Sequence, residues 1–270
     1  RKHMSQFLIA LPVFNEDKHV QEVLDQVLRY TDHVLVVEDG STDNTASILK
    51  ERTAKRGDIT VIHHETNLGY GAALATAFAY ALQPRDDGSR WDGLVTIDCD
   101  GQHQPQLIPS FIAAIGNPEQ PAADIVSGSR YLKDLPDNSQ APEGRRRINM
   151  DITAEINQRL GLSLTDAFCG FKAYSQNALR ALPVTEPGYA MPLEVWVLAA
   201  AKKLKIVELP VPLVYLDLTR SFGGALDDGT TRIAHYREIL ERAIRSIQAG
   251  SGVNRGVGYG VGSPAQRVDA

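Results

Sequence analysis

The sequence predicts an α/β protein whose mostly parallel central sheet is flanked by helices. Short apolar runs alternate with segments of helical period, and polar turns follow the apolar runs, as in chains that build parallel sheets. Hydrophobic residues make up 43% of the 270 residues and charged residues 23%, which is ordinary for a protein with a packed core. The length accommodates one large α/β domain or at most two small ones.

Each predicted strand of the first half is a short apolar run. These strands are residues 7–13, 33–37, 59–63, 94–97 and 125–127. The predicted helices are residues 18–30, a segment capped by residues 41–45 that runs to about residue 56, and residues 72–82. One face of the first helix is apolar, as expected of a helix that packs onto a sheet, and consists of Val20, Val23, Leu24, Val27 and Leu28.

The second half has a different rhythm. We expect a helix over 148–160, a loop holding Asp166 and residues 169–172, a helix over 193–203 and a strand over 206–211. Residues 232–248 form an amphipathic helical pattern. Residues 250–270 are rich in glycine and lack periodicity, which predicts a loosely packed tail. Residues 1–3, ahead of Met4, resemble an addition to the natural chain.

Composition excludes several classes of protein. The formal net charge of −5 argues against a nucleic-acid binder, because such proteins usually carry a basic surplus. No run of about 18 uncharged apolar residues is present, so no membrane-spanning helix is predicted. Cys99 and Cys169 are too few for a disulfide framework or a structural zinc site, and they suit a reducing compartment. Together these features predict a cytoplasmic protein.

The strongest local signal is the sequence Asp-Cys-Asp-Gly-Gln at residues 98–102, directly after an apolar run. Alternate side chains of an extended chain point the same way, so Asp98, Asp100 and Gln102 are expected to converge. Mg²⁺ or Mn²⁺ binds such oxygen ligands, usually together with substrate phosphates, and would neutralise a diphosphate leaving group. The alternative interpretation is an ordinary polar turn after a strand.

Two further polar turns are expected at the same sheet edge. Asp39 follows the second strand, where open α/β sheets bind ligands, and its carboxylate can accept from a ribose hydroxyl or a base N–H. Asn15 and Glu16 follow the first strand. Capping of the next helix is the alternative for Asp39, and it is the favoured interpretation for Ser41 and Asp43. Three acidic turns at one edge indicate a site for a nucleotide and its cation.

Other candidates carry less information. The glycines of residues 67–71 open a predicted helix, where backbone N–H groups can approach an anion, although a structural role is favoured. Arg130, Lys172, Arg220 and the arginines at 145–147 could pair with phosphates, while arginine runs most often form solvated surface.

Taken in order, Pro12-Val-Phe-Asn-Glu, Val37-Glu-Asp-Gly-Ser, the 98–102 motif and the later arginines resemble the family 2 glycosyltransferases. Within that family they are similar to the polyprenyl-phosphate sugar synthases, such as the dolichyl-phosphate mannose synthases. The resemblance covers roughly residues 7–236. It implies a GT-A fold over residues 4–249, with a donor half to about residue 130 and an acceptor half from 131 onward. It also implies a UDP- or GDP-linked sugar donor, Mg²⁺ or Mn²⁺, and inversion at the anomeric carbon.

The resemblance also assigns residues by position. The implied nucleoside pocket consists of Pro12, Phe14, Glu16, Val37 and Asp39. Asp98 is implied at the ribose or the sugar, Asp100 and Gln102 on the metal, and Arg130 and Arg220 at donor or acceptor phosphates.

The acceptor remains open at this point. The lysine that follows the late arginine in the synthases is missing from residues 221–226, and no membrane anchor is predicted. A phosphate acceptor needs no general base, whereas a hydroxyl acceptor would require one, with Asp166 as the candidate and Glu194 in reserve. Asp166 is equally compatible with a structural role in fixing its loop. A nucleotide-sugar-binding protein without turnover is the remaining hypothesis.

The amphipathic segment 232–248 bears on membrane contact. Its polar positions include Arg232, Arg237, Arg242 and Arg245, so the helix could lie in an interface with anionic head groups. Packing of its apolar face onto its own domain is the favoured alternative. Because a polyprenyl phosphate resides in a bilayer, the resemblance predicts a cytoplasmic enzyme that visits the membrane surface, with Arg220 and Arg147 receiving the acceptor phosphate.

Overall fold

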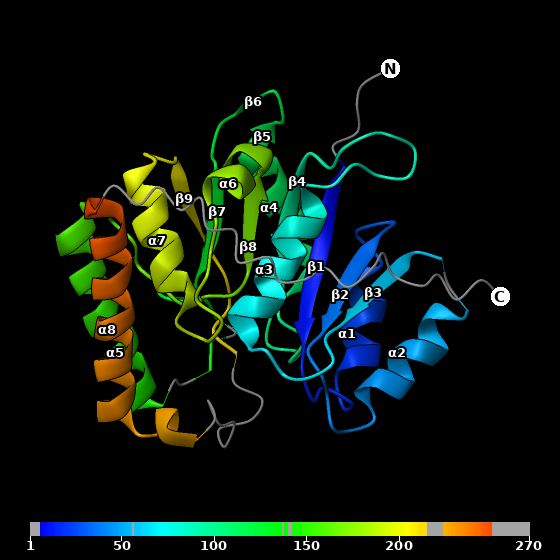
Figure 1. The fold of residues 1–270 in the computed structure, drawn as a ribbon, viewed down its shortest axis with the longest axis horizontal. Coiled ribbons are helices and arrows are strands. Elements are labelled where there is room, and N and C mark those ends of the chain that lie inside the picture. The colour runs from blue at the N-terminus through cyan, green and yellow to red at the C-terminus, as the bar shows by residue number, and fades with distance from the viewer. Residues whose placement is uncertain (1–5, 56, 137, 140–141, 215–223, 250–270) are drawn as a thin grey trace.

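The computed structural model describes residues 6–55, 57–136, 138–139, 142–214 and 224–249. A seven-stranded sheet forms the centre, with helices on both of its faces (Figure 1). The strand order is β3-β2-β1-β4-β8-β7-β9, and all neighbouring pairs are parallel except the two that β8 makes. The predicted fold class is therefore confirmed.

The strands of this sheet are β1 (Phe7–Val13), β2 (Val34–Glu38), β3 (Ile59–His63), β4 (Gly93–Thr96), β7 (Ile125–Ser129), β8 (Lys172–Ser175) and β9 (Ile206–Pro210). Two short strands, β5 (Gly116–Asn117) and β6 (Gln120–Pro121), form a separate antiparallel pair.

The α-helices are α1 (Val20–Val27), α2 (Thr45–Thr53), α3 (Tyr70–Ala81), α4 (Ile108–Ile115), α5 (Glu143–Leu160), α6 (Gln176–Ala181), α7 (Met191–Ala201) and α8 (Gly229–Gln248). Single 3-10 turns occur at η1 (Pro105–Leu107) and η2 (Gly224–Asp227).

The two faces of the sheet bury two separate apolar clusters. Successive side chains of a strand point to opposite faces, so Leu8 and Ala10 of β1 pack with α3, α5, α6, α7 and α8. Ile9, Leu11 and Val13 of the same strand pack with α1, α2 and α4 on the other face. Because both faces are covered, the central strands are continuous apolar runs, which is why β1 and β2 were predictable from the sequence.

Strand β8 and helix α4 were not predicted. The segment 169–172 was expected to be a loop, but Lys172 begins β8, which lies antiparallel between β4 and β7. A strand of four residues that begins with a lysine shows no apolar run. Helix α4 has eight residues and a proline at its start, which also gives a weak helical pattern.

Helix α8 packs its apolar face onto the protein itself. Its buried residues include Tyr236, Ile239, Leu240 and Ala243, which join the cluster that α5 and α7 share. Figure 1 shows α8 alongside α5 and α7. The favoured alternative for residues 232–248 is therefore confirmed, and this apolar face is not available to a bilayer. Within the described ranges, no helix is both long and apolar enough to cross a membrane.

Candidate active site

The predicted site residues gather along one edge of the sheet. Strands β1, β2, β4 and β7 run in the same direction, so their carboxyl ends share an edge, which is the lower one in Figure 1. In open α/β sheets this edge is where ligands bind. The turns that leave these strands carry Glu16, Asp39, Asp98 and Arg130.

Asp39 holds the loop that connects β3 to α3. Oδ1 accepts a hydrogen bond from the N–H of Leu68 (2.9 Å) and lies 2.6 Å from Nδ1 of His64, while Oδ2 accepts from the N–H of Gly69 (2.8 Å). Nε2 of His64 lies 3.0 Å from Oγ1 of Thr76 on α3. The Asp39 side chain is 4% exposed. The backbone N–H groups that were candidates for an anion site therefore bind this carboxylate.

The other residues predicted for a nucleoside pocket differ in accessibility. Phe14 is 38% exposed and Pro12 is partly exposed, so both offer surface to a ligand. Glu16 is buried, and its N–H donates to Oγ1 of Thr45 (2.9 Å). Val37 has no exposed surface and lies in the core beneath α3, so its side chain cannot contact a ligand in this conformation.

Hydrogen bonds tie together the turns that precede α2. Oγ of Ser41 accepts from the N–H of Asn15 (3.0 Å), and Oδ1 of Asn15 accepts from the N–H of Thr42 (2.8 Å). Oδ1 of Asp43 accepts from the N–H of Thr45, the first residue of α2 (2.9 Å). Capping therefore describes Asp43, whereas Ser41 joins the turn after β2 to the turn after β1.

Asp98, which follows β4, is held from three directions. Its side chain is 27% exposed, and the phenol of Tyr70 donates to Oδ1 (3.0 Å). Its N–H donates to Nδ1 of His103 (3.0 Å), and Nε2 of that ring lies 3.7 Å from Oδ2. A Cβ atom at Gly170 would lie 2.4 Å from Oδ2, so only glycine fits beside the carboxylate. These three partners were not identified from the sequence.

The turn after Asp98 does not continue as an extended strand. Strand β4 ends at Thr96, and Gly101 has a φ of 73°, a left-handed conformation that suits glycine. Oδ1 of Asp100 accepts from the N–H of Gln102 (3.0 Å), which closes the turn. The extended-chain argument for the convergence of these side chains is therefore wrong.

The chemistry of this turn nevertheless fits a hard divalent cation. Asp98 and Asp100 supply carboxylates and Gln102 an amide oxygen, and all three residues are partly exposed. In the part of the chain that the structure describes, no three His, Cys, Asp or Glu side chains are placed to hold a metal by themselves. A Mg²⁺ or Mn²⁺ site with one or two carboxylates and substrate phosphates does not require such a cluster.

Asp166 and Arg130 form a buried ion pair. Nε of Arg130 donates to Oδ2 (2.6 Å) and its Nη2 to Oδ1 (2.9 Å), while Nδ2 of Asn149 also donates to Oδ1 (2.9 Å). The Asp166 side chain is 0% exposed and that of Arg130 is 23% exposed. Burial by itself raises the pKa of Asp166, but the Arg130 charge and the hydrogen bonds hold that pKa well below its ordinary value. Of the two roles expected for Asp166, general base and structural residue of its loop, this geometry supports the second.

Three other predicted groups have different outcomes. Arg220 lies outside the described residues. Oε2 of Glu194, the reserve base, accepts from the N–H of Thr185 (2.7 Å) and so serves the loop before α7. Lys172 is buried in the sheet, where its ammonium donates to the carbonyl of Cys169, and burial lowers its pKa.

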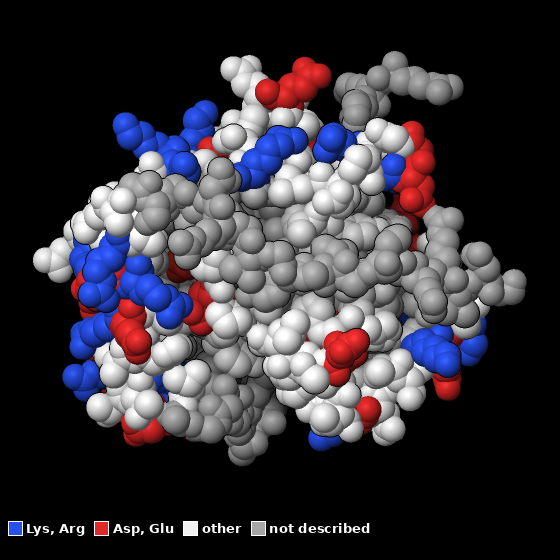
Figure 2. All heavy atoms as spheres, viewed as in Figure 1, with Lys and Arg blue, Asp and Glu red and all other residues white. Residues whose placement is uncertain are grey.

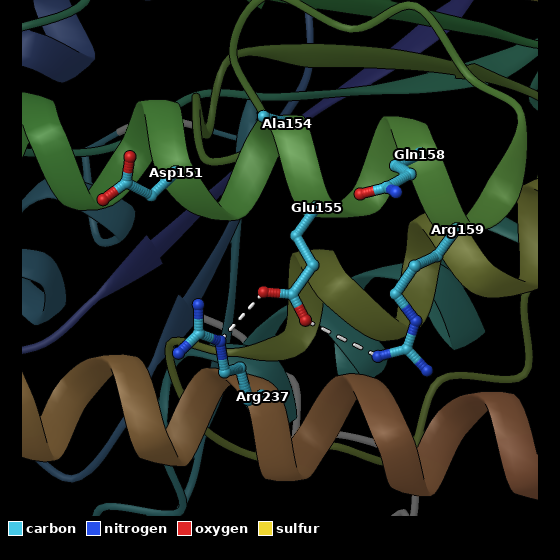
Figure 3. A pocket seen from close by; sticks show the side chains of 6 residues that line it. All are labelled: Asp151, Ala154, Glu155, Gln158, Arg159 and Arg237. Carbon is cyan, nitrogen blue, oxygen red and sulfur yellow. Dashed lines mark hydrogen bonds and ion pairs between the residues drawn. The ribbon is translucent and has the colours of Figure 1, made fainter.

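A shallow polar groove lies away from this edge, between α5 and α8 (Figure 3). Nε of Arg237 donates to Glu155 (2.9 Å), and Nη1 of Arg159 lies 3.6 Å from Glu155 and 2.8 Å from Glu241. On the face shown in Figure 2, basic side chains over these helices are interspersed with acidic ones. These mutual pairs join the two helices, and we assign no ligand to the groove.

The chain is similar to known glycosyltransferases in sequence and in fold. A family model described as Glycosyl transferase family 2 matches residues 8–182. An undecaprenyl-phosphate mannosyltransferase of Micrococcus luteus is 29% identical over 238 residues, which are 85% of this chain and 93% of that protein. A polyprenol monophosphomannose synthase of Mycolicibacterium smegmatis is 26% identical over 248 residues, 87% of this chain and 89% of that protein.

Solved structures show the same fold. The glucosyl-3-phosphoglycerate synthase of Mycobacterium tuberculosis superposes with a TM-score of 0.63 at 18% identity, covering 90% of this chain and 80% of that one. A crystal structure of that enzyme with Mn²⁺, UDP and glucosyl-3-phosphoglycerate superposes with a TM-score of 0.61 at 17% identity, covering 90% and 79%. The chain therefore belongs to glycosyl transferase family 2 and is a glycosyltransferase with a GT-A fold.

Proposed function

We propose that this chain transfers a sugar, with inversion, from a UDP- or GDP-linked donor to a polyprenyl phosphate, and that Mg²⁺ or Mn²⁺ is required. One of the relatives described above is named an undecaprenyl-phosphate mannosyltransferase and the other a polyprenol monophosphomannose synthase. The structural neighbour was solved with Mn²⁺ and UDP. These names and complexes support the donor, the cation and the acceptor class.

The proposal that the acceptor is a phosphate rests on the ion pair that Asp166 forms with Arg130. A general base works best when its pKa lies near the working pH, but the Arg130 charge and hydrogen bonds hold the pKa of this carboxyl far lower. Both carboxylate oxygens already accept hydrogen bonds. An acceptor phosphate is an anion at neutral pH and needs no base. A phosphate acceptor therefore suits this site better than a hydroxyl does.

In this proposal the cation is held by Asp100 and Gln102. The ribose or the sugar of the donor lies at Asp98. The cation, when bound, neutralises the charge that builds on the diphosphate leaving group. Pro12 and Phe14 offer surface to the nucleoside, with the loop that Asp39 holds beside them. A phosphate oxygen of the acceptor attacks the anomeric carbon opposite the diphosphate, and the bond to the diphosphate breaks, so the configuration inverts.

Arg130 is suited to a phosphate in the same scheme. Its Nε and Nη2 donate to Asp166, which fixes the plane of the guanidinium, and the Nη1 side is directed away from that carboxylate. Arg146 lies near the same place, since both guanidinium groups approach the ring of Tyr131, at 5.7 Å for Arg130 and 6.0 Å for Arg146. Arg220 keeps its predicted role at the acceptor phosphate.

A lipid acceptor requires contact with a membrane surface, and we propose the loops of the same edge for that contact. The exposed large apolar side chains in these loops are Phe14, Leu68, Leu132 and Tyr189. They take the place of the apolar face of α8, which is packed inside the protein. Exposed apolar groups beside basic ones favour an interface with anionic lipid.

Sugar transfer to a short-chain polyprenyl phosphate tests the proposal. The protein is incubated with UDP-glucose or GDP-mannose and Mn²⁺, and the matched control acceptor is the same polyprenol without its phosphate. We expect a glycolipid phosphate of inverted configuration, little product with the polyprenol, and loss of transfer in EDTA. Transfer to hydroxyl acceptors alone would favour the hydroxyl hypothesis. Donor binding without transfer or hydrolysis would favour the non-catalytic one.

A further inference from the structure

Tyr70 is the first residue of α3, and its side chain contacts Asp98, which lies in the turn after β4. Its hydroxyl donates to Oδ1 over 3.0 Å. A tyrosine hydroxyl carries its proton at neutral pH, and an ionised carboxylate can only accept, so the phenol is the donor in this contact. On the opposite side, a Cβ atom at Gly170 would lie 2.4 Å from Oδ2 of Asp98 and 2.7 Å from the Tyr70 oxygen. The carboxylate is thus confined between Tyr70 and Gly170.

The segment of residues 185–189, here called the strap, holds Tyr70 in turn. The ring of Tyr189 stacks on that of Tyr70, with centroids 5.5 Å apart and planes at 18°. The carbonyl of Pro187 accepts from the N–H of Ala72 in the first turn of α3 (3.1 Å). A Cβ atom at Gly71 would lie 2.1 Å from the carbonyl oxygen of Glu186, so strap and helix are in direct backbone contact.

The strap is anchored at two points of its own. Oε2 of Glu194 on α7 accepts from the N–H groups of Thr185 and Glu186, at 2.7 Å each. The Glu186 side chain is 6% exposed, and its carboxylate accepts from the N–H of Gly188 (3.1 Å) and from the guanidinium of Arg242 on α8. A charge on α8 is therefore linked to the strap, and through the strap to the residue that holds Asp98.

We propose that Tyr70 is a positioning residue for the Asp98 carboxylate, and that the strap keeps Tyr70 in place through the Glu186–Arg242 ion pair. This proposal rests on the proposed function, because it assigns a use to Asp98 in donor binding. It extends the site to residues that support Asp98 from further away, including Arg242 on α8.

Tyr70→Phe tests the first link, since it keeps the ring stack with Tyr189 and removes only the hydroxyl. Tyr80→Phe, at the other end of α3, is the matched control. Binding of UDP and GDP with Mn²⁺ is measured by isothermal titration, and the donor kcat and KM are measured by hydrolysis. We expect Tyr70→Phe to lower kcat/KM for the donor about tenfold or more, as for a lost hydrogen bond to a charged group. The control should match the parent.

A double-mutant cycle separates positioning from a general structural effect. Tyr70→Phe should add little to Asp98→Asn, because both changes act on one interaction. Additive losses of donor binding in the double mutant would show that Tyr70 does not act through Asp98. A thermal midpoint so low that Tyr70→Phe is largely unfolded at the assay temperature would show that Tyr70 acts on the fold instead.

Glu186→Gln tests the second link, with Glu241→Gln as its control, since Glu241 also pairs with an arginine but lies off the strap. We expect Glu186→Gln to weaken donor binding by roughly 2- to 30-fold, in the range of mutations that couple distant sites. It should add little in the Tyr70→Phe background. If all variants bind the donor as well as the parent does, the role of Tyr70 and the strap is refuted, while the proposed function stands. A parent that binds neither UDP nor GDP and hydrolyses no nucleotide sugar overturns the proposed function together with it.

Discussion

Asp166→Asn distinguishes a buried ion-pair partner from a general base. The substitution keeps the size of the side chain but removes its charge. The Arg130 guanidinium, whose side chain is 23% exposed, then loses the carboxylate that receives its Nε and Nη2 hydrogen bonds. Breaking a buried pair by removing one partner costs about 3–5 kcal/mol. Because one end of this pair reaches solvent, we expect the lower part of that range for the free energy of unfolding at neutral pH.

The effect should depend on pH in a defined direction. Burial opposes ionisation of Asp166, but the Arg130 charge and hydrogen bonds outweigh it and hold the folded-state pKa below the unfolded value. A group with a depressed folded-state pKa contributes stability above the unfolded pKa, about 3.9, and loses it as the pH falls through the folded pKa. The difference between parent and variant should therefore stay constant from pH 8 to about 5. It should shrink below about pH 4.

Urea unfolding followed by circular dichroism at several pH values measures this difference. Asp151→Asn on α5 is the matched control, because the pair of Asp151 with Arg147 is exposed and should contribute little. Sugar transfer is assayed in parallel. A variant as stable as the parent that loses transfer by about a hundredfold or more would refute the structural role and identify Asp166 as the base.

Three further predictions concern the cation, the close packing at Asp98 and the response to acid. Asp100→Asn should weaken nucleoside-diphosphate binding in Mn²⁺ and change it little in EDTA; equal losses in both would exclude a metal ligand. Gly170→Ala should weaken donor binding, because its Cβ would lie 2.4 Å from Oδ2 of Asp98, while Gly144→Ala, with open space around it, should not. Burial and then the Arg85 charge lower the folded-state pKa of His33, so its contribution to stability should fall as the pH drops below about 6.5. His33→Gln should flatten that pH dependence, and an unchanged slope in urea unfolding would contradict it.

The sheet and its functional edge were largely predictable because both depend on local signals. Strands β1 and β2 are buried on both faces, so each is an unbroken apolar run that stands out in the sequence. The rule that parallel strands share a carboxyl edge then places Asp39 and Asp98 on that edge without further information. For this reason the edge could be predicted before the order of the strands was known.

Strand β8 could not be predicted in this way. It is four residues long and begins with Lys172, whose ammonium lies 5.4 Å from the ring of Trp196 and donates to the carbonyl of Cys169. A lysine is normally read as an exposed position, since burial of its charge is costly without partners. Its partners come from α7 and from the preceding loop, so nothing local signals that this residue lies inside a sheet.

The partners of the site carboxylates were missed for a related reason. Tyr70 and Asp98 are 28 residues apart, and Asp39 and Gly69 are 30 apart. Their contacts exist only because α3 begins at the sheet edge, which depends on the strand order. The local geometry of the metal turn also failed as an argument, because the positive φ of Gly101 bends a chain that was taken to be extended.

The partners also decide which of three similar aspartates can meet a ligand. Asp39 and Asp98 follow strands and Asp166 lies in the loop after α5, and their side chains are 4%, 27% and 0% exposed, respectively. Backbone N–H groups and a histidine enclose the first, and an arginine and an asparagine enclose the last. Asp98 has the most exposed side chain of the three, although the Tyr70 phenol, the His103 ring and Gly170 all lie beside it. Because an enclosed carboxylate would have to give up existing hydrogen bonds to bind a donor, we propose that Asp98 makes the more direct contact with the ligand.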